Sequence, residues 1–206
     1  MSEKVRRAYL RHIAEKYVSK RRHNCIYVHE LCGCPIRATL DKMLQKYSII
    51  DISNMSDKII IGELLHEGIK NVLTYEECYE PTEKCRILTI NGRDIEICGT
   101  ADILCEGEVI EVKYVSKTDK VVNNSTVTPY EHHILQVRLY GWLYSVDRCV
   151  LLYITPTRIV HVVEKPLTDD EVVRHVESWL SWERTPMWDW ECRYCRYVNM
   201  CEYAKR

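Results

Sequence analysis

The sequence predicts one domain that mixes helices and β-strands. Two glycine-containing turns, Asn91-Gly92 and Glu106-Gly107-Glu108, each separate two short segments that alternate apolar and polar residues, as the strands of a hairpin do. Other segments repeat apolar residues at helical spacing. The chain has 206 residues, 46% of them apolar and 29% charged, so it can bury a sizeable core, which argues against wholesale disorder.

Helices are expected before these hairpins, over residues 3–20, 36–47 and 57–73. Pro35 suits the first turn of the second helix, because no backbone donor is required there, and Ser56 is an expected N-cap of the third. The first helix carries an apolar stripe formed by Val5, Tyr9, Ile13, Ala14 and Tyr17.

The second half of the chain is expected to add further strands and helices. Residues 116–128 are polar and are expected to form a mobile loop beside the candidate site. A capping box at Thr168 and Glu171 predicts the start of the last helix. The other expected elements are strands over 86–90, 94–98, 149–155 and 158–164, and helices over 129–146 and 168–183.

The stretch from Gly99 to Tyr114 contains the strongest candidate site. Alternation on its second strand directs Glu111 and Lys113 away from the apolar face, and antiparallel pairing brings Asp102 near Glu111. Two neighbouring carboxylates repel unless a proton or a cation lies between them, and Mg²⁺ or Mn²⁺ accepts such oxygen ligands. The alternative is an ordinary solvated strand face with a Glu–Lys contact.

Three helical residues extend this candidate site. His66 lies one turn after Gly62 on the same helix face, where the missing side chain allows a close approach. Gln136 and Tyr140 are spaced i, i+4 on a later helix, where they could bind phosphate or water, or stack on a base. The alternatives are a surface histidine, an exposed glutamine and a half-buried tyrosine.

The formal net charge of −1 does not by itself indicate a nucleic-acid binder. Residues 1–22, however, carry eight Lys or Arg against two Glu, and this basic stretch could meet phosphates or form a solvated helix face. The N-terminus lacks the apolar region of a signal peptide, and no apolar run approaches the roughly 20 residues of a membrane span. We therefore expect a cytoplasmic protein that does not enter a membrane.

Eleven cysteines in an intracellular chain favour a metal site over a disulfide framework, which an odd number also fits poorly. The tail contains C-x2-C-x5-C, formed by Cys192, Cys195 and Cys201. With a fourth ligand, these thiolates could hold zinc or a 4Fe–4S cluster. Cys34, which precedes a proline, is the preferred fourth ligand, followed by Cys32 and then Cys25. Such a site would clasp the N-terminal helices to the C-terminus.

The remaining cysteines are either disulfide partners, as in some hyperthermophile proteins, or small buried apolar residues. They are Cys25, Cys78, Cys85, Cys98, Cys105 and Cys149.

The order of these motifs resembles the CRISPR-associated RecB-like iron–sulfur exonucleases, the fourth Cas family. The matching series is Cys34-Pro35, Gly62-Glu-x-x-His66, Gly99-Thr-Ala-Asp102, Glu111-Val-Lys113, Gln136-x-x-x-Tyr140 and the C-x2-C-x5-C tail. It covers about residues 28–203. One departure is Ile36, which stands before Arg37 where the family often has Cys-Pro-Arg, so a role for that arginine does not carry over.

The resemblance implies a PD-(D/E)xK restriction-endonuclease-like core, with a central mixed sheet flanked by helices and an iron–sulfur clasp joining the N-terminal and C-terminal segments. It implies a single RecB-like nuclease domain over residues 1–206. The nuclease core would span about residues 57–165, and the cluster-binding elements about 25–47 and 185–206.

The resemblance also implies roles for individual residues. The catalytic residues would be Asp102, Glu111, Lys113, Gln136 and Tyr140. The Mg²⁺ or Mn²⁺ ligands would be His66, Asp102, Glu111 and the carbonyl of Val112. The 4Fe–4S ligands would be Cys34, Cys192, Cys195 and Cys201, with Cys32 as the alternative to Cys34.

The implied activity is metal-dependent exonuclease cutting of single-stranded DNA in the 5′ to 3′ direction, which processes fragments for CRISPR spacer acquisition. Expected partners are single-stranded or partially duplex DNA and the CRISPR integrase proteins, and a homo-oligomer is compatible with the sequence. The alternative is a non-catalytic iron–sulfur or zinc DNA-binding adaptor of the integrase complex.

Overall fold

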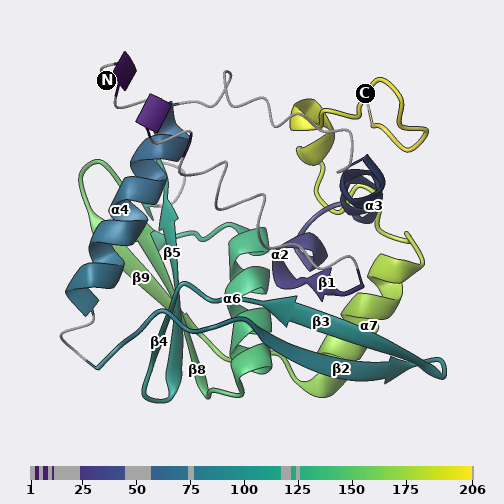
Figure 1. Ribbon diagram of the computed structural model, residues 1–206, viewed down its shortest axis with the longest axis horizontal. Coiled ribbons are helices and arrows are strands. Elements are labelled where there is room, and N and C mark those ends of the chain that lie inside the picture. Colours follow the sequence, from purple (N-terminus) through teal and green to yellow (C-terminus); the bar gives the residue numbers. More distant parts are fainter. Residues whose placement is uncertain are drawn as a thin grey trace.

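The fold was analysed in a computed structural model of the chain (Figure 1). The structure describes residues 3–4, 7–8, 11, 24–44, 57–73, 77–116, 122–123 and 126–205. Residues 3–4, 7–8 and 11 are helical, but the apolar stripe expected for this helix lies outside the described residues. The expected cap at Ser56 and most of the basic stretch also lie outside them.

Two sheets carry the candidate site. The first has the order β1-β3-β2, in which β2 (Lys84–Ile90) pairs antiparallel with β3 (Arg93–Gly99), and β1 (Ile26–Tyr27) runs parallel to β3. The expected hairpin is confirmed: Asn91 and Gly92 connect β2 and β3, both with positive φ, at 52° and 75°. Glycine carries no steric penalty in this backbone region.

The second sheet is mixed and has the order β4-β5-β8-β9. β5 (Glu108–Tyr114) pairs antiparallel with β4 (Ile103–Cys105) and parallel with β8 (Arg148–Ile154), which pairs antiparallel with β9 (Ile159–Glu164). Gly107 turns between β4 and β5 with a φ of 73°. The register pairs Ile103 with Ile110, so the next pair outward is Asp102 and Glu111, as the antiparallel arrangement predicts.

The helices pack around these sheets. α2 (Val28–Leu31) was not expected, whereas α3 (Pro35–Leu44), α4 (Asp57–Leu73), α6 (Glu131–Tyr144) and α7 (Asp169–Leu180) confirm predicted helices. The predicted capping box begins α7: the Glu171 amide donates to Thr168 Oγ1 over 3.2 Å, and the Thr168 amide donates to Glu171 Oε2 over 2.8 Å. A short 3-10 helix, η3 (Glu191–Tyr194), lies in the C-terminal tail.

The expected loop over residues 116–128 is partly wrong. It contains β6 (Val122–Asn123) and β7 (Thr126–Val127), which form a small antiparallel pair. Valine and threonine within this segment favour extended backbone. The loop was predicted from polar composition, which does not take this preference into account.

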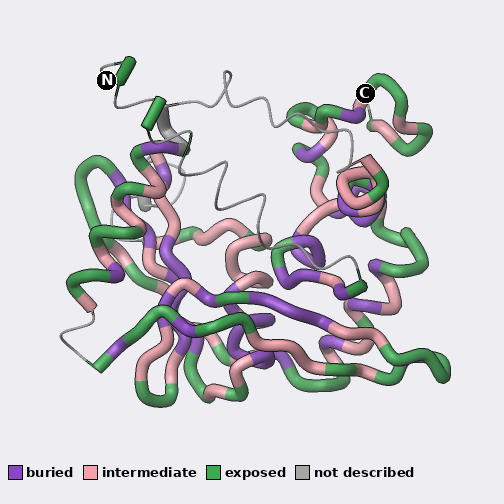
Figure 2. Tube along the Cα trace, viewed as in Figure 1, coloured by how far each residue is buried: buried purple, intermediate pink, exposed green. Residues whose placement is uncertain are grey.

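The core lies where α6 contacts strands of both sheets (Figure 2). Val137, Leu139 and Leu143 of α6 are fully buried there, beside Leu151 and Tyr153 of β8. α4 covers the opposite face of β5 and contributes Leu65 and Ile69 to a second apolar cluster. Because β5 is covered on both faces, any polar group on it that points inward loses water. In the described part of the chain, no helix combines the length and apolar character of a membrane span.

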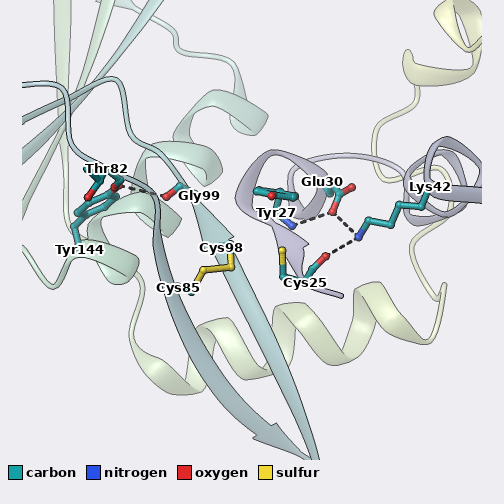
Figure 3. The surroundings of a disulfide bond; sticks show 9 residues. All are labelled: Cys25, Tyr27, Glu30, Lys42, Thr82, Cys85, Cys98, Gly99 and Tyr144. Atoms are coloured by element: carbon teal, nitrogen blue, oxygen red, sulfur yellow. Dashed lines mark hydrogen bonds and ion pairs between the residues drawn. A yellow bond between two sulfur atoms is a disulfide. The ribbon is translucent and has the colours of Figure 1, made fainter. Parts of the chain in front are cut away.

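Four of the six undecided cysteines form disulfides. Cys85 and Cys98 are directly paired across β2 and β3, and their bond lies beside Cys25 and Tyr27 (Figure 3). The second bond joins Cys78 to Cys105 of β4. The remaining two, Cys25 and Cys149, are buried thiols, as expected for small apolar residues.

The C-terminal segment lies against α2 and α3 (Figure 1). Trp179 Nε1 donates to the carbonyls of Glu30 and Gly33, and Trp188 Nε1 donates to the carbonyl of Cys32. Tyr197 OH donates to Asp41 of α3 over 2.7 Å. Trp179 therefore joins α7 to the segment around α2. Trp182, which follows α7, is 40% exposed, and its ring contacts that of Tyr203.

The carboxylate of Glu191 is the most buried polar contact of this junction, at 4% exposure. It accepts the amide of Cys34 over 2.8 Å and the amide of Trp188 over 2.9 Å. Both amides belong to segments that have no other regular structure, so the carboxylate replaces a backbone partner for each.

We predict that Glu191→Ala lowers the free energy of unfolding by about 2–4 kcal/mol, because it leaves two partly buried amides without an acceptor. Urea titration followed by circular dichroism measures the change. The matched control is Glu202→Ala, which removes an exposed carboxylate from the same tail and should change stability by less than about 0.5 kcal/mol. Equal effects of the two substitutions would contradict the prediction.

Candidate active site

Residues from β5, from the segment just before β4 and from α4 meet beside the second sheet. Glu111 and Lys113 alternate with apolar neighbours on β5, Asp102 lies just before β4, and His66 projects from α4. The adjoining cleft has a volume of about 430 Å³, and its lining includes Gly62, Glu63, His66, Asp102, Val112 and Lys113. Of these residues, the sequence analysis did not name Glu63, and it named Val112 only for its backbone carbonyl.

Asp102 is held by two contacts. Its Oδ1 lies 2.8 Å from Nε2 of His66, and its Oδ2 accepts the backbone amide of Val112 over 2.8 Å. Burial raises the pKa of this carboxyl, but the hydrogen bond and charge of His66 outweigh burial and lower it overall. The Asp102 carboxylate is therefore ionised and fixed relative to the backbone of β5.

The pKa of His66 shifts in the opposite direction to that of Asp102. Burial lowers its pKa, but the hydrogen bond to Asp102 outweighs burial and raises the pKa above its ordinary value. His66 and Asp102 thus each stabilise the charged form of the other at the cleft.

Glu111 is buried to 1% exposure, and Lys113 Nζ donates to its Oε1 over 2.6 Å. Among the residues that the structure describes, no group hydrogen-bonds to its other oxygen, Oε2. Burial, and then the charge of Asp102, raise the pKa of Glu111 to about 7, although Lys113 opposes this shift. A buried carboxylate oxygen without a donor, beside a second carboxylate, is an environment that a divalent cation would stabilise.

Lys113 keeps its charge in this setting. Burial lowers its pKa, but the nearby carboxylates of Glu111 and Asp102 outweigh burial and raise it. An ammonium group is therefore present at the wall of the cleft.

Of the proposed cation ligands, His66 and Asp102 lie closer to each other than both do to Glu111. His66 and Asp102 are in contact, whereas His66, Asp102 and Glu111 are not among the described sets whose ligand atoms all lie within 4.8 Å of one another. Lys113 is the neighbour of Glu111 instead. One set that meets this distance is Glu63, His66 and Glu67 on α4. The spacing of these three residues along a helix, i, i+3 and i+4, is the signal that could have identified them.

Gln136 and Tyr140 lie together on α6, as expected. Their side chains hydrogen-bond, and burial followed by the charges of Glu111 and Asp102 raises the pKa of Tyr140, so its hydroxyl stays neutral. The Tyr140 ring packs on Gly99 of β3: a Cβ at residue 99 would lie only 2.9 Å from Tyr140 Cε1. Glycine at this position therefore allows the tyrosine to approach the two carboxylates.

Four cysteines line a separate pocket between α3 and the tail, and they are Cys34, Cys192, Cys195 and Cys201. Cys32 instead belongs to the main apolar core, where burial and then the charge of Glu111 raise the pKa of its thiol. The geometry therefore favours Cys34 over Cys32 as the fourth member of the set. Cys25 packs against the Cys85–Cys98 disulfide, away from this pocket (Figure 3).

We predict that Mn²⁺ affinity rises with pH between pH 6 and 8. A carboxyl group with a pKa of about 7 must lose its proton to bind the cation, so below pH 7 affinity should fall up to about tenfold per pH unit. Isothermal titration calorimetry at pH 6, 7 and 8 measures this. Glu111→Gln, which cannot ionise, should bind weakly with a smaller pH dependence. Equal affinity of the unsubstituted protein at pH 6 and 8 would contradict the prediction.

The fold has counterparts among solved structures. The crystal structure of SSO0001 superimposes with a TM-score of 0.86 at 28% identity, covering 98% of both chains. An alkaline exonuclease from Laribacter hongkongensis superimposes at 0.54 with 12% identity, over 86% of this chain and 93% of that one. A phage-related exonuclease from Haemophilus somnus 129PT gives 0.52 with 13% identity, over 80% and 93%. The expected PD-(D/E)xK-like fold is thus confirmed.

Sequence comparison gives the closer assignment. No family model matches the chain. The CRISPR-associated exonuclease Cas4 of Saccharolobus solfataricus is 31% identical over 185 residues, which cover 86% of this chain and 87% of that protein. Similarity at this level and over this length confirms the resemblance found in the motif order. The chain belongs to the family of the CRISPR-associated exonuclease Cas4.

Proposed function

We propose that this chain is a divalent-metal-dependent DNA exonuclease. The observation that supports this proposal most directly is the buried Oε2 of Glu111, which has no hydrogen-bond donor among the described residues. It lies beside an ionised aspartate and a charged lysine, both of which line a cleft of about 430 Å³. The family and the exonuclease neighbours support the same activity.

The residues that would hold Mg²⁺ or Mn²⁺ are His66, Asp102, Glu111 and the carbonyl of Val112. When bound, such a cation polarises the scissile phosphate and lowers the pKa of a water molecule. Lys113 donates to Oε1 of Glu111, so Oε2 is the oxygen that would be left for the cation.

Each protein group then has a distinct task. Lys113 would orient the attacking water and offset the charge that develops on the phosphate oxygens. Asp102 is kept in place by His66 and by the Val112 amide. The neutral Tyr140 hydroxyl, bonded to Gln136, offers a donor near the carboxylates without adding charge.

We further propose that the substrate is single-stranded or partially duplex DNA, cut from the 5′ end, and that the products are fragments for CRISPR spacer acquisition with the integrase proteins. The family resemblance supports this role. Within the proposed single domain, residues 57–165 would supply the chemistry, and residues 25–47 with 185–206 would hold the cluster.

We propose that the four-cysteine pocket holds a 4Fe–4S cluster, as the family resemblance implies. Four thiolates could also hold a single zinc ion, and metal analysis separates the two. The distance of these cysteines in sequence from the carboxylates favours a structural role.

A non-catalytic adaptor is the alternative function. A chelator separates the two proposals, because an adaptor would bind DNA without releasing nucleotides whether or not Mn²⁺ is present. Zinc in place of the cluster would give a colourless protein.

We predict that Glu111→Ala and Lys113→Ala each reduce Mn²⁺-dependent nucleotide release from end-labelled single-stranded DNA by at least about 100-fold, or roughly 3 kcal/mol in activation free energy. The control is Glu108→Ala, at the far end of the same strand, where the carboxylate pairs with Arg148 over 3.5 Å. That variant should keep its activity. Folded Glu111 or Lys113 variants with full activity would exclude the assignment.

We predict that Cys34→Ser, purified without oxygen, loses most of its iron, sulfide and brown absorbance, because a pocket-lining ligand is removed. Cys32→Ser should retain them, since this residue lies in the apolar core. Metal analysis of both variants provides the measurement. Stoichiometric zinc without iron in the unsubstituted protein would show that the site holds zinc and not a cluster. Loss of iron from Cys32→Ser but not from Cys34→Ser would make Cys32 the fourth ligand.

A further inference from the structure

A row of aromatic rings extends from the candidate active site to the C-terminal tail. Its members, in spatial order, are Tyr153, His133, His132, Trp190 and Tyr194, here called the ring row. Consecutive ring centroids are separated by 5.6, 4.1, 5.0 and 6.5 Å. Neither the proposed chemistry nor the cluster uses these side chains.

The inner end of the row is fixed beside the site. Nδ1 of His133 lies 2.9 Å from the hydroxyl of Tyr153, which also accepts the backbone amide of Tyr130 over 3.0 Å. His132 precedes Gln136 and Tyr140 by one and two helical turns, so it continues their face of α6. The ring row therefore begins on the helix face that carries two candidate catalytic residues.

Both histidines lie within the electrostatic reach of Lys113. Burial, and then the charge of Lys113, lower the pKa of His132 to about 4. Burial, followed by the charges of His132 and Lys113, lowers the pKa of His133 to about 2. At neutral pH these rings are uncharged flat surfaces next to the candidate active site.

The outer end of the row is open to solvent. Trp190 is 40% exposed and Tyr194 is 80% exposed. Both lie at η3, and exposed Arg193 stands between them in the sequence. Large exposed rings beside a cation match the features that hold single-stranded nucleic acid, in which bases stack on rings and a cation meets the phosphates.

We propose that the solvent-facing rings of the ring row form a stacking track for the bases of a single DNA strand whose end lies at the carboxylates, whereas the fully buried Tyr153 only fixes His133. This inference rests on the proposed exonuclease function. Lys113 lines the cleft and lies within electrostatic range of His132 and His133, so a strand that leaves the cleft past Lys113 reaches the ring row. The occupant is single-stranded, because the base faces of a duplex are already stacked on one another and cannot lie on protein rings.

The test is a binding cycle in EDTA, which prevents cleavage. Fluorescence anisotropy measures the dissociation constants of the cluster-loaded protein for oligothymidine and for a strand of equal length that carries abasic sites. The variants are Trp190→Ala and Tyr194→Ala. The control is Trp182→Ala, because Trp182 has the same 40% exposure but contacts Tyr203 at 6.0 Å and does not belong to the row.

Each ring-row variant should bind oligothymidine about tenfold more weakly, the loss expected for one stacked base. Both should bind the abasic strand within twofold of the unsubstituted protein, and Trp182→Ala should match it on both strands. If Trp190→Ala loses its cluster absorbance, Tyr194→Ala gives the same answer. Unchanged oligothymidine affinity, or an equal loss on the abasic strand, would overturn the stacking track.

Failure of the track can be separated from failure of the proposed function. Hydrolysis of a thymidine nitrophenyl phosphodiester, which is too short to reach Trp190, tests the carboxylates alone. If the unsubstituted protein hydrolyses this ester with Mn²⁺ but the variants bind oligothymidine normally, the exonuclease function stands and the track is excluded. If the protein hydrolyses neither the ester nor DNA, the exonuclease function fails, and the track with it.

Discussion

The buried carboxylate of Glu111 is the constraint on which the rest of the candidate site depends. A charge on a strand that is covered on both faces costs free energy unless nearby groups compensate for it. Lys113 compensates for one oxygen, and the other has no hydrogen-bond partner among the described residues. Asp102, fixed by His66 and by the backbone of β5, adds a second negative charge nearby. Carboxylates held in this way favour binding of a cation over hydration. The fold thereby creates the site for the cation on which the proposed hydrolysis depends.

The same wall of the molecule connects the site to the cysteine pocket. α6 carries Gln136 and Tyr140 towards the carboxylates, and His132 on its first turn contacts the tail at Trp190. Glu191, the next residue, accepts the amide of Cys34. A short chain of contacts thus runs from the proposed catalytic helix to the proposed cluster ligands. A structural cluster would accordingly fix the position of the tail, and with it the outer end of the ring row.

Local sequence signals predicted much of this arrangement. Asn91-Gly92 predicted a hairpin because these residues tolerate positive φ, and the Thr168–Glu171 box predicted the start of α7. The alternation of β5 and the antiparallel turn at Gly107 predicted that Asp102 would lie opposite Glu111. The polar composition of residues 116–128 was misleading, since it concealed the short strands β6 and β7.

The sequence by itself determined the motif order, the strand alternation and the thiol spacing, because each depends on residues that are neighbours along the chain. Only the tertiary structure placed Cys34 at the pocket of the tail cysteines and Cys32, two positions away, in the apolar core. It also paired Glu111 with Lys113, added Glu63 to the cleft lining, and aligned His132 with Trp190. These outcomes depend on how α3, α4, α6 and the tail pack together. No local pattern encodes such packing, because it is set by the burial of surfaces contributed by distant segments.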